Sequence, residues 1–126
     1  MFFQFQSPTI KTIIKDIAYA IALVDPYEKY GIDKYLYAIG LCVDPAYRGQ
    51  GLGVEILKAR LDLLRAVGLK CTLTAFSGYA AQKAALKAGY EVLSEVPYDH
   101  FKHEDGSPVY PDVECKSMLV MAKKIE

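Results

Sequence analysis

The stretch VDPAYRGQGLGVEILKARLDLLRAVG, Val43 to Gly68, decides the fold, because in it a tight turn leads into a long amphipathic helix. Three glycines and Arg48 stand within the six residues where that helix is expected to begin. Glycine in a helical first turn costs roughly 1 kcal/mol relative to alanine, so helix stability does not explain the cluster. The first amides of a helix lack intrahelical acceptors and carry the positive end of its dipole. The stretch therefore predicts an anion site, in which Gly49, Gly51 and Gly53 let a diphosphate approach the backbone and Arg48 adds charge.

Alternating apolar patterns on both sides of this stretch predict an α/β fold. Helical spacing and capping signals predict helices over residues 8–23, from the glycine cluster to Gly68, and over 78–89. Apolar and β-branched runs predict strands over residues 35–43, 70–76, 90–96 and 115–125, and FFQF, residues 2–5, favours a further short strand.

The order of these elements predicts a mixed sheet. Helical crossovers imply at least two parallel strands, and the last two strands are expected to be antiparallel because no helix joins them. The continuous apolar run 35–43 indicates a strand that is buried on both faces. Residues 25–34 have the composition of a turn-rich connection.

The composition is that of one globular domain. The chain has 126 residues, 52% hydrophobic and 24% charged, with no apolar run long enough for a membrane span. Fifteen basic residues balance fifteen acidic ones, so the charge favours neither nucleic acid nor a membrane surface as a partner. The opening MFFQFQ is too short for a secretory signal, which predicts a cytoplasmic protein. Cys42, Cys71 and Cys115 are expected as reduced, buried thiols.

Two common nucleotide-binding patterns do not fit the glycine cluster. A nucleoside-triphosphatase loop ends in Gly-Lys-Ser or Gly-Lys-Thr, but here Gly53 is followed by Val54 and Glu55. A dinucleotide-binding fingerprint needs G-x-G-x-x-G, whereas Gly49 to Gly53 read G-x-G-x-G, and no acidic residue ends the next strand. The cluster therefore points to another phosphate-bearing ligand.

Residues Arg48 to Gly53 instead match R-x-x-G-x-G, and the chain around them resembles the GNAT superfamily of acyltransferases. LYAIGLCVDPAYRGQGLGVEILKARLDLLRAVG, residues 36–68, is similar to the family's fourth strand, coenzyme A pyrophosphate loop and third helix. LTAFSGYAAQKAALKAGYEV, residues 73–92, resembles the fifth strand, the fourth helix and the entry into the sixth strand. VPYDHF and the ending KSMLVMAKKI are similar to the arylalkylamine N-acetyltransferase-like branch of insects. The resemblance runs from about Tyr27 to the C-terminus.

This resemblance implies a GNAT-like mixed β-sheet flanked by helices, with acetyl-coenzyme A as co-substrate and no metal. It implies that the fourth strand diverges from the fifth, so that main-chain groups of Leu41, Cys42 and Val43 pair with the pantetheine arm. It also implies that Ala81 and Lys83 border the pantetheine arm. The pyrophosphate loop that it implies consists of Arg48, Gly49, Gln50, Gly51, Leu52 and Gly53.

The resemblance further implies an N-acetyltransferase that passes the acetyl group directly to a primary arylalkylamine. Residues 1–126 are interpreted as one partial, N-terminally shortened domain. No carboxylate precedes Asp16 to act as the general base, and only Ser77 and Tyr79 remain as candidates near the expected acid position. Two alternatives stay open: a non-catalytic coenzyme A-binding half-domain with a regulatory or vestigial role, and an interaction module that binds no coenzyme A. Exposed sheet edges favour pairing, so we expect a homodimer, with strand exchange as one route to it.

Two further groups of side chains have competing interpretations. His100 and His103 lack a third metal ligand in register and favour a solvated loop. Tyr98, His100 and Phe101 fit either an acceptor wall or packing. Four tyrosines have two interpretations: they line an aromatic amine pocket, or they pack in the core, which is the more common role for tyrosine. They are Tyr27, Tyr30, Tyr35 and Tyr37.

Overall fold

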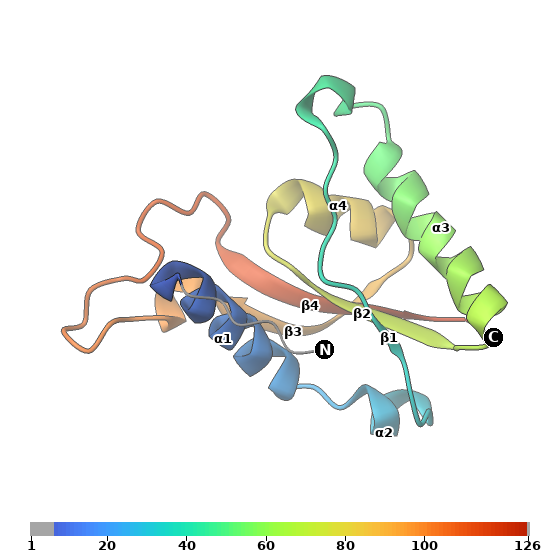
Figure 1. The fold of residues 1–126 in the computed structure, drawn as a ribbon, viewed down its shortest axis with the longest axis horizontal. Helices are drawn as coiled ribbons and strands as arrows, with labels where there is room; N and C mark the ends of the chain where they lie inside the picture. The colour runs from blue at the N-terminus through green and yellow to red at the C-terminus, as the bar shows by residue number, and fades with distance from the viewer. Residues whose placement is uncertain (1–6, 126) are drawn as a thin grey trace.

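The computed structural model describes residues 7–125 and contains a mixed sheet flanked by helices (Figure 1). The helical elements are α1 (Pro8–Ala22), α2 (Pro26–Tyr30), the 3-10 turn η1 (Pro45–Tyr47), α3 (Leu52–Val67), α4 (Tyr79–Lys87) and the 3-10 turn η2 (Tyr98–His100). The strands are β1 (Leu36–Tyr37), β2 (Cys71–Phe76), β3 (Glu91–Pro97) and β4 (Ser117–Lys124). The predicted short strand over residues 2–5 lies outside the described residues.

The sheet has the strand order β1-β2-β4-β3. β1 is parallel to β2, whereas β4 is antiparallel to both of its neighbours. The expected mixed sheet and the expected antiparallel last pair are therefore confirmed. β1 is an edge strand, because only one of its sides pairs with another strand of the described chain.

Two cores form, one on each face of the sheet. β2 is buried along its whole length, and its alternate residues Cys71, Leu73 and Ala75 pack in a cluster that includes Ala20 of α1. The other cluster includes Leu57 of α3, Phe76 of β2, and Ala85, Tyr90 and Met121. Figure 1 shows the corresponding layers, with α1 on one side of the sheet and α3 and α4 on the other.

Local capping signals define the helix ends. The Ser7 hydroxyl accepts a hydrogen bond from the Ile10 amide, and Pro8 occupies the first turn of α1. Gly68 ends α3 in the left-handed conformation, with φ 78°. Among the described residues, no helix is long and apolar enough to cross a membrane.

The prediction of an irregular connection over residues 25–34 is wrong in part, because α2 lies there. The Asp25 side chain accepts a hydrogen bond from the Glu28 amide, Pro26 begins the helix, and Gly31 ends it with φ 64°. Asp-Pro and Gly are turn signals, and they are also the cap signals of a helix of only a few residues. Sequence pattern alone does not separate these two outcomes at this length.

The prediction of a strand over residues 35–43, buried on both faces, is also wrong. Only Leu36 and Tyr37 pair with β2, and Ile39 is 84% exposed. Cys42 is exposed too, which corrects the expectation that all three thiols are buried; Cys71 and Cys115 are buried as expected. The apolar run 35–43 does not continue in the sheet, because residues 39–44 diverge from β2 and only Leu41 packs against a core cluster.

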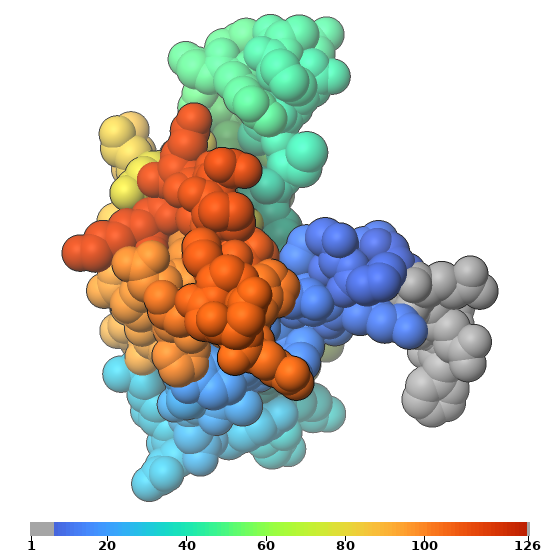
Figure 2. Space-filling view, turned by 90° about the vertical axis from the view of Figure 1, so that its left-hand side faces the viewer, coloured from blue at the N-terminus to red at the C-terminus, as the bar shows by residue number. Residues whose placement is uncertain are grey.

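The long segment between β3 and β4 folds back against α1. Its chain reverses at Gly106, and an isolated bridge joins Lys102 to Pro108. The hydroxyl of Tyr110 donates a 2.6 Å hydrogen bond to the carboxylate of Asp16, which is buried on α1. Figure 2 shows this orange segment beside the blue helix. The contact brings residues 94 positions apart in the sequence to the same place.

Candidate functional site

The parallel pairing of β1 with β2 is short, and the chain after β1 diverges from β2. The Ala38 amide still donates to the Leu73 carbonyl, at 3.1 Å, and beyond it no hydrogen bond joins residues 39–44 to β2 within the described chain. The main-chain groups of Leu41 and Cys42 have no hydrogen-bond partner among residues 7–125, and the Val43 carbonyl accepts only from Arg48 Nε, at 3.0 Å. In Figure 1 this segment climbs away from the sheet toward η1. We call the divergence of residues 39–44 from β2 the splay.

The glycine-rich turn at the far end of the splay presents unpaired amides. Asp44 caps η1 by accepting from the Ala46 amide at 2.8 Å, and the first hydrogen bond of α3 runs from the Glu55 amide to the Gly51 carbonyl at 3.2 Å. Within residues 7–125, none of the amides from Gly49 to Val54 donates to a protein atom. Because α3 is 16 residues long, its dipole adds to the attraction that these donors exert on an anion.

The three glycines of the turn have different physical reasons to be glycine. Gly49 and Gly51 are left-handed, with φ 80° and 78°, and a Cβ on either would meet open space. Gly53 is helical, and a Cβ there would lie 3.3 Å from Ala84 Cβ and 3.5 Å from Leu41 Cδ2. Gly53 therefore lets α3 approach α4 and the splayed segment closely, in addition to any role toward a ligand.

Arg48 is exposed at the start of the turn. Its Nε is used by the Val43 carbonyl, which holds the guanidinium against the splayed segment. No ion pair involves Arg48 among the described residues. Glu55, the acidic residue in the first turn of α3, lies 3.6 Å from Lys58 Nζ. The turn thus has a cation without a carboxylate partner next to the free amides.

The other predicted site residues lie on α4 and at its start. Ala81 is half-buried and packs against the cluster of Leu57 and Phe76, and Lys83 is exposed. The Ser77 carbonyl accepts a 2.8 Å hydrogen bond from the Tyr98 hydroxyl, and the Tyr79 hydroxyl accepts from the Lys116 amide at 3.2 Å. Neither Ser77 nor Tyr79 has a carboxylate or imidazole hydrogen-bond partner in the described chain.

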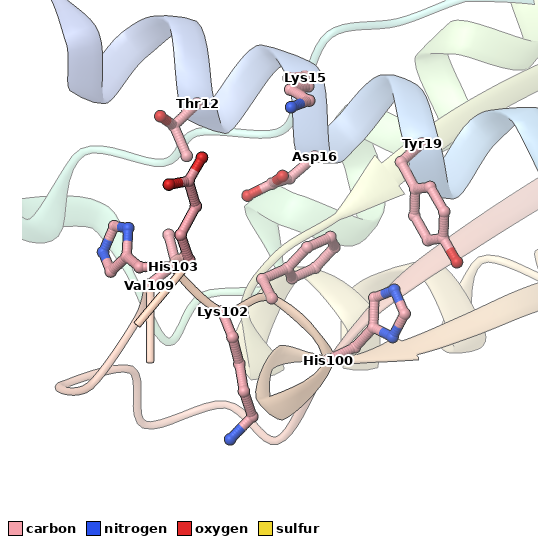
Figure 3. Close-up of a pocket in the computed structure, with 10 residues that line it drawn as sticks. Thr12, Lys15, Asp16, Tyr19, His100, Lys102, His103 and Val109 are labelled. Atoms are coloured by element: carbon pink, nitrogen blue, oxygen red, sulfur yellow. The ribbon is translucent and has the colours of Figure 1, made fainter. Parts of the chain in front are cut away.

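A separate surface pocket of about 370 Å³ lies between α1 and the β3–β4 segment (Figure 3). Asp16 and Tyr19 line it from α1, and His100 and Phe101 line it from the other side. The rings of Tyr19 and His100 stack with centroids 5.1 Å apart. Tyr98 does not line this pocket: it is buried, and burial raises its pKa to about 12. His100 and His103 both line the pocket, and no group of three metal-ligating side chains occurs in the described part of the chain.

The tyrosines of the α2–β1 region lie elsewhere. Tyr27 and Tyr35 are in ring contact, with centroids 5.3 Å apart, and the Tyr30 hydroxyl donates to the Glu91 carboxylate. Tyr35 and Tyr30 pack against the α1-side core, which fits the packing interpretation. Tyr37 is 43% exposed at the sheet edge.

Sequence reasoning missed one residue beside the splay, Arg60. The pattern puts Arg60 outside the apolar stripe of α3, yet its side chain is half-buried and donates to the Gly40 carbonyl and to Thr74 Oγ1. Its position three residues after Leu57 and four before Leu64, both buried, is the signal that could have indicated an inward direction.

The model of the acetyltransferase (GNAT) family matches residues 15–90. A comparison with curated proteins finds no match.

Solved structures that resemble the chain include three mosquito proteins. The protein designated arylalkylamine N-acetyltransferase 7 of the yellow fever mosquito Aedes aegypti is 34% identical, with a TM-score of 0.87, over 100% of this chain and 53% of its own. Arylalkylamine N-acetyltransferase 2 of Aedes aegypti is 22% identical, with a TM-score of 0.87, over 97% of this chain and 57% of its own. Mosquito arylalkylamine N-acetyltransferase like 5b is 27% identical, with a TM-score of 0.82, over 97% of this chain and 58% of its own. The chain therefore spans little more than half the length of these solved relatives.

Proposed function

Because this chain belongs to the GNAT acetyltransferase family, we propose that it binds acetyl-coenzyme A and takes part in acetyl transfer to a primary arylalkylamine. The observation that carries the proposal is the row of amides from Gly49 to Val54 at the start of a long helix, which have no acceptor among residues 7–125, beside Arg48, which has no ion-pair partner there. Backbone donors at a helix N-terminus favour phosphate oxygens, and a guanidinium adds charge-assisted hydrogen bonds. The proposed ligand of the turn is the pyrophosphate of coenzyme A.

The splay supports the same ligand. A pantetheine arm contains amide groups that donate and accept hydrogen bonds, and the free main-chain groups of Leu41 and Cys42 can pair with them as a strand would. Recognition through main-chain groups depends on where the segment lies more than on its side chains. The turn and the splay are continuous in the chain, so one extended ligand can contact both.

When bound, acetyl-coenzyme A would supply an activated acyl group as a thioester. In direct transfer the amine nitrogen forms a bond to the acetyl carbon as the carbon–sulfur bond breaks, and a proton leaves the amine while the released thiolate gains one. General acid or base help is worth about 10²- to 10⁴-fold, so positioning alone leaves a slower reaction. Ser77 and Tyr79 are the hydroxyl groups of this chain that stand at the β2–α4 junction, and we assign neither of them a proton-transfer role.

The chain's relatives supply the substrate class of the proposal. Mosquito proteins with arylalkylamine N-acetyltransferase in their names share the fold, and the first of them is 34% identical. Since the chain spans little more than half of each, coenzyme A binding and acetyl transfer to the amine are tested separately.

Calorimetric titration with coenzyme A tests the binding half. We expect the chain to bind coenzyme A, and Arg48→Glu and Gly51→Val each to weaken binding at least tenfold, since one reverses the charge and the other strains a left-handed residue. Arg65→Glu on the exposed face of the same helix is the matched control and should bind as the original chain does. Absence of binding by the original chain, or equal binding by all variants, rejects the pyrophosphate site and leaves an interaction module.

Release of thiol from acetyl-coenzyme A tests the transfer half. Dopamine, tryptamine and a polyamine are offered separately, and release that depends on the amine supports the enzyme. Binding of coenzyme A without amine-dependent release favours a non-catalytic half-domain instead.

A further inference from the structure

Arg60 links the two sides of the splay. It extends from α3, and its Nη1 donates to Thr74 Oγ1 on β2 at 3.1 Å, while its Nη2 donates to the carbonyl of Gly40 on the diverging segment. Gly40 comes two residues after Ala38, where the backbone pairing with β2 ends. Where the backbone hydrogen bonds to β2 end, the guanidinium of Arg60 thus connects residues 39–44 to the sheet by hydrogen bonds.

The surroundings of Arg60 do not contain a carboxylate partner. No ion pair of Arg60 occurs among residues 7–125. Thr74 is fully buried and Tyr90 is 3% exposed, and the pKa of Tyr90 is raised by burial while the nearby Arg60 cation opposes the rise. A half-buried cation without a counter-ion is costly unless its donors are satisfied. Its fixed place is therefore defined by the carbonyl and the hydroxyl that it bridges.

We propose that Arg60 is a positioning residue that sets the opening of the splay and thereby the fit of the pantetheine arm. This inference rests on the proposed function. Leu41, the next residue after Gly40, packs against the core cluster that includes Leu57 of α3. A contact that holds Gly40 therefore also holds the backbone that leads to Cys42 and Val43. Arg60 itself acts through these main-chain groups and is not assigned to the pyrophosphate, which belongs to the turn from Arg48 to Gly53.

Arginine suits this position for a geometric reason. Its planar fork presents two donors in fixed directions, so one side chain can hold two acceptors on different elements. Lysine keeps the charge but offers a single nitrogen on a flexible stem. Arg60→Lys therefore keeps the positive charge but removes the planar pair of donors, so it tests the geometry of the side chain alone.

The test compares two ligands on the full chain. Coenzyme A contacts the turn and the splay, whereas ADP has a diphosphate and no pantetheine arm. By calorimetry we expect Arg60→Lys to weaken coenzyme A binding about tenfold and to leave ADP binding within twofold, in keeping with the loss of one charge-assisted hydrogen bond. Arg65→Lys, the same substitution on the exposed face of α3, is the matched control and should change neither affinity.

A second variant, Thr74→Val, keeps nearly the same side-chain size and removes the hydroxyl that accepts from Arg60. It should weaken coenzyme A binding in the same selective way, and it decides the matter if Arg60→Lys fails to fold in a thermal unfolding scan. An equal loss of coenzyme A and ADP affinity, or no loss of either, in a folded variant overturns the positioning role. If the original chain binds neither ligand, the proposed function itself has failed, which is a distinct result.

Discussion

The amide of Ala38 lies 3.1 Å from the carbonyl oxygen of Leu73, and this is the last hydrogen bond between β2 and the segment after β1 in the described chain. Past this pair, the main-chain groups of Leu41 and Cys42 have no hydrogen-bond partner in the part of the chain that the structure describes, and the strand they leave, β2, is fully buried. Unpaired backbone groups near a core are normally satisfied by a partner or by water. The splay is therefore a place where an extended ligand can add hydrogen bonds without breaking any that the protein already has.

Hydrogen exchange follows directly from these free amides. The amides of Leu41, Cys42 and Val43 should exchange rapidly in the free protein, since no acceptor among residues 7–125 binds them. Coenzyme A should slow their exchange at least tenfold, and ADP should not. Mass spectrometry of peptides covering residues 39–44 measures the effect. Protection by ADP as strong as that by coenzyme A would show that the splay does not contact the pantetheine arm.

Thiol labelling distinguishes Cys42 from the other two cysteines. Cys42 is exposed, whereas Cys71 and Cys115 are buried, so one thiol should react with Ellman's reagent quickly in the folded chain. Saturating coenzyme A should slow that reaction several-fold, because Cys42 lies on the splayed segment. Cys42→Ala serves as the control and should remove the fast phase. A fast phase that persists in this variant would assign it to a different thiol.

The contact of α3 with α4 predicts an effect of Gly53 on stability. A Cβ on Gly53 would meet Ala84 Cβ at 3.3 Å, so Gly53→Ala should lower the free energy of unfolding by about 1 kcal/mol even though alanine favours helices. Adding Ala84→Gly should offset part of this loss in a double-mutant cycle of urea unfolding. Gly51→Ala is the comparison: its Cβ would enter open space but its φ is 78°, so its loss should not respond to Ala84→Gly. Strict additivity at Gly53 and Ala84 would refute the close-packing explanation.

Alkaline pH should destabilise the fold. Burial raises the pKa of the Cys71 thiol from 9.0 to about 11, and the folded state therefore holds this proton more tightly than the unfolded state. The resulting stabilisation is complete below pH 9.0 and is lost as pH rises toward 11; two pKa units at roughly 1.4 kcal/mol each correspond to about 3 kcal/mol. Urea unfolding between pH 8 and 11 measures the slope. Cys71→Ala should make the slope shallower, and Cys42→Ala, which removes an exposed thiol, should leave it unchanged.

The open edge of β1 predicts self-association. Among residues 7–125, β1 pairs on one side only; Tyr37 on β1 is 43% exposed and Ile39, just after it, is 84% exposed. We propose that a second copy of the chain covers this edge, since an apolar edge strand favours pairing. Light scattering should then give twice the monomer mass of 14.0 kDa at micromolar concentration. Ile39→Lys should yield the monomer, whereas Leu63→Lys on the exposed side of α3 should not. A monomeric original chain over the accessible concentration range argues against this interface.

Local rules made most of the helices and the sheet topology predictable from the sequence. Ser7 and Pro8 begin α1, the Gly-rich turn precedes α3, Gly68 ends it, and the absence of a helix between β3 and β4 implies their antiparallel pairing. Each of these signals involves residues close together in the chain. The pattern R-x-x-G-x-G also predicted a turn that exposes backbone amides, because the left-handed glycines and the helix start lie within a few residues of each other.

Apart from the short helix α2, whose cap signals are also turn signals, the errors and omissions concern contacts between distant segments. Whether residues 39–44 extend the sheet or leave it depends on Leu73, Thr74 and Arg60, which lie more than 15 positions away, and the apolar run 35–43 is compatible with either outcome. The burial of Arg60 and the hydrogen bond from Tyr110 to Asp16 were decided in the same way. The sequence by itself determined the longer helices, the glycine-rich turn and the resemblance to the family; the tertiary structure decided the splay and the contacts that hold it. The physical reason is that caps and periodicity are energies of neighbouring residues, whereas a strand's departure from its sheet depends on which distant groups satisfy its backbone.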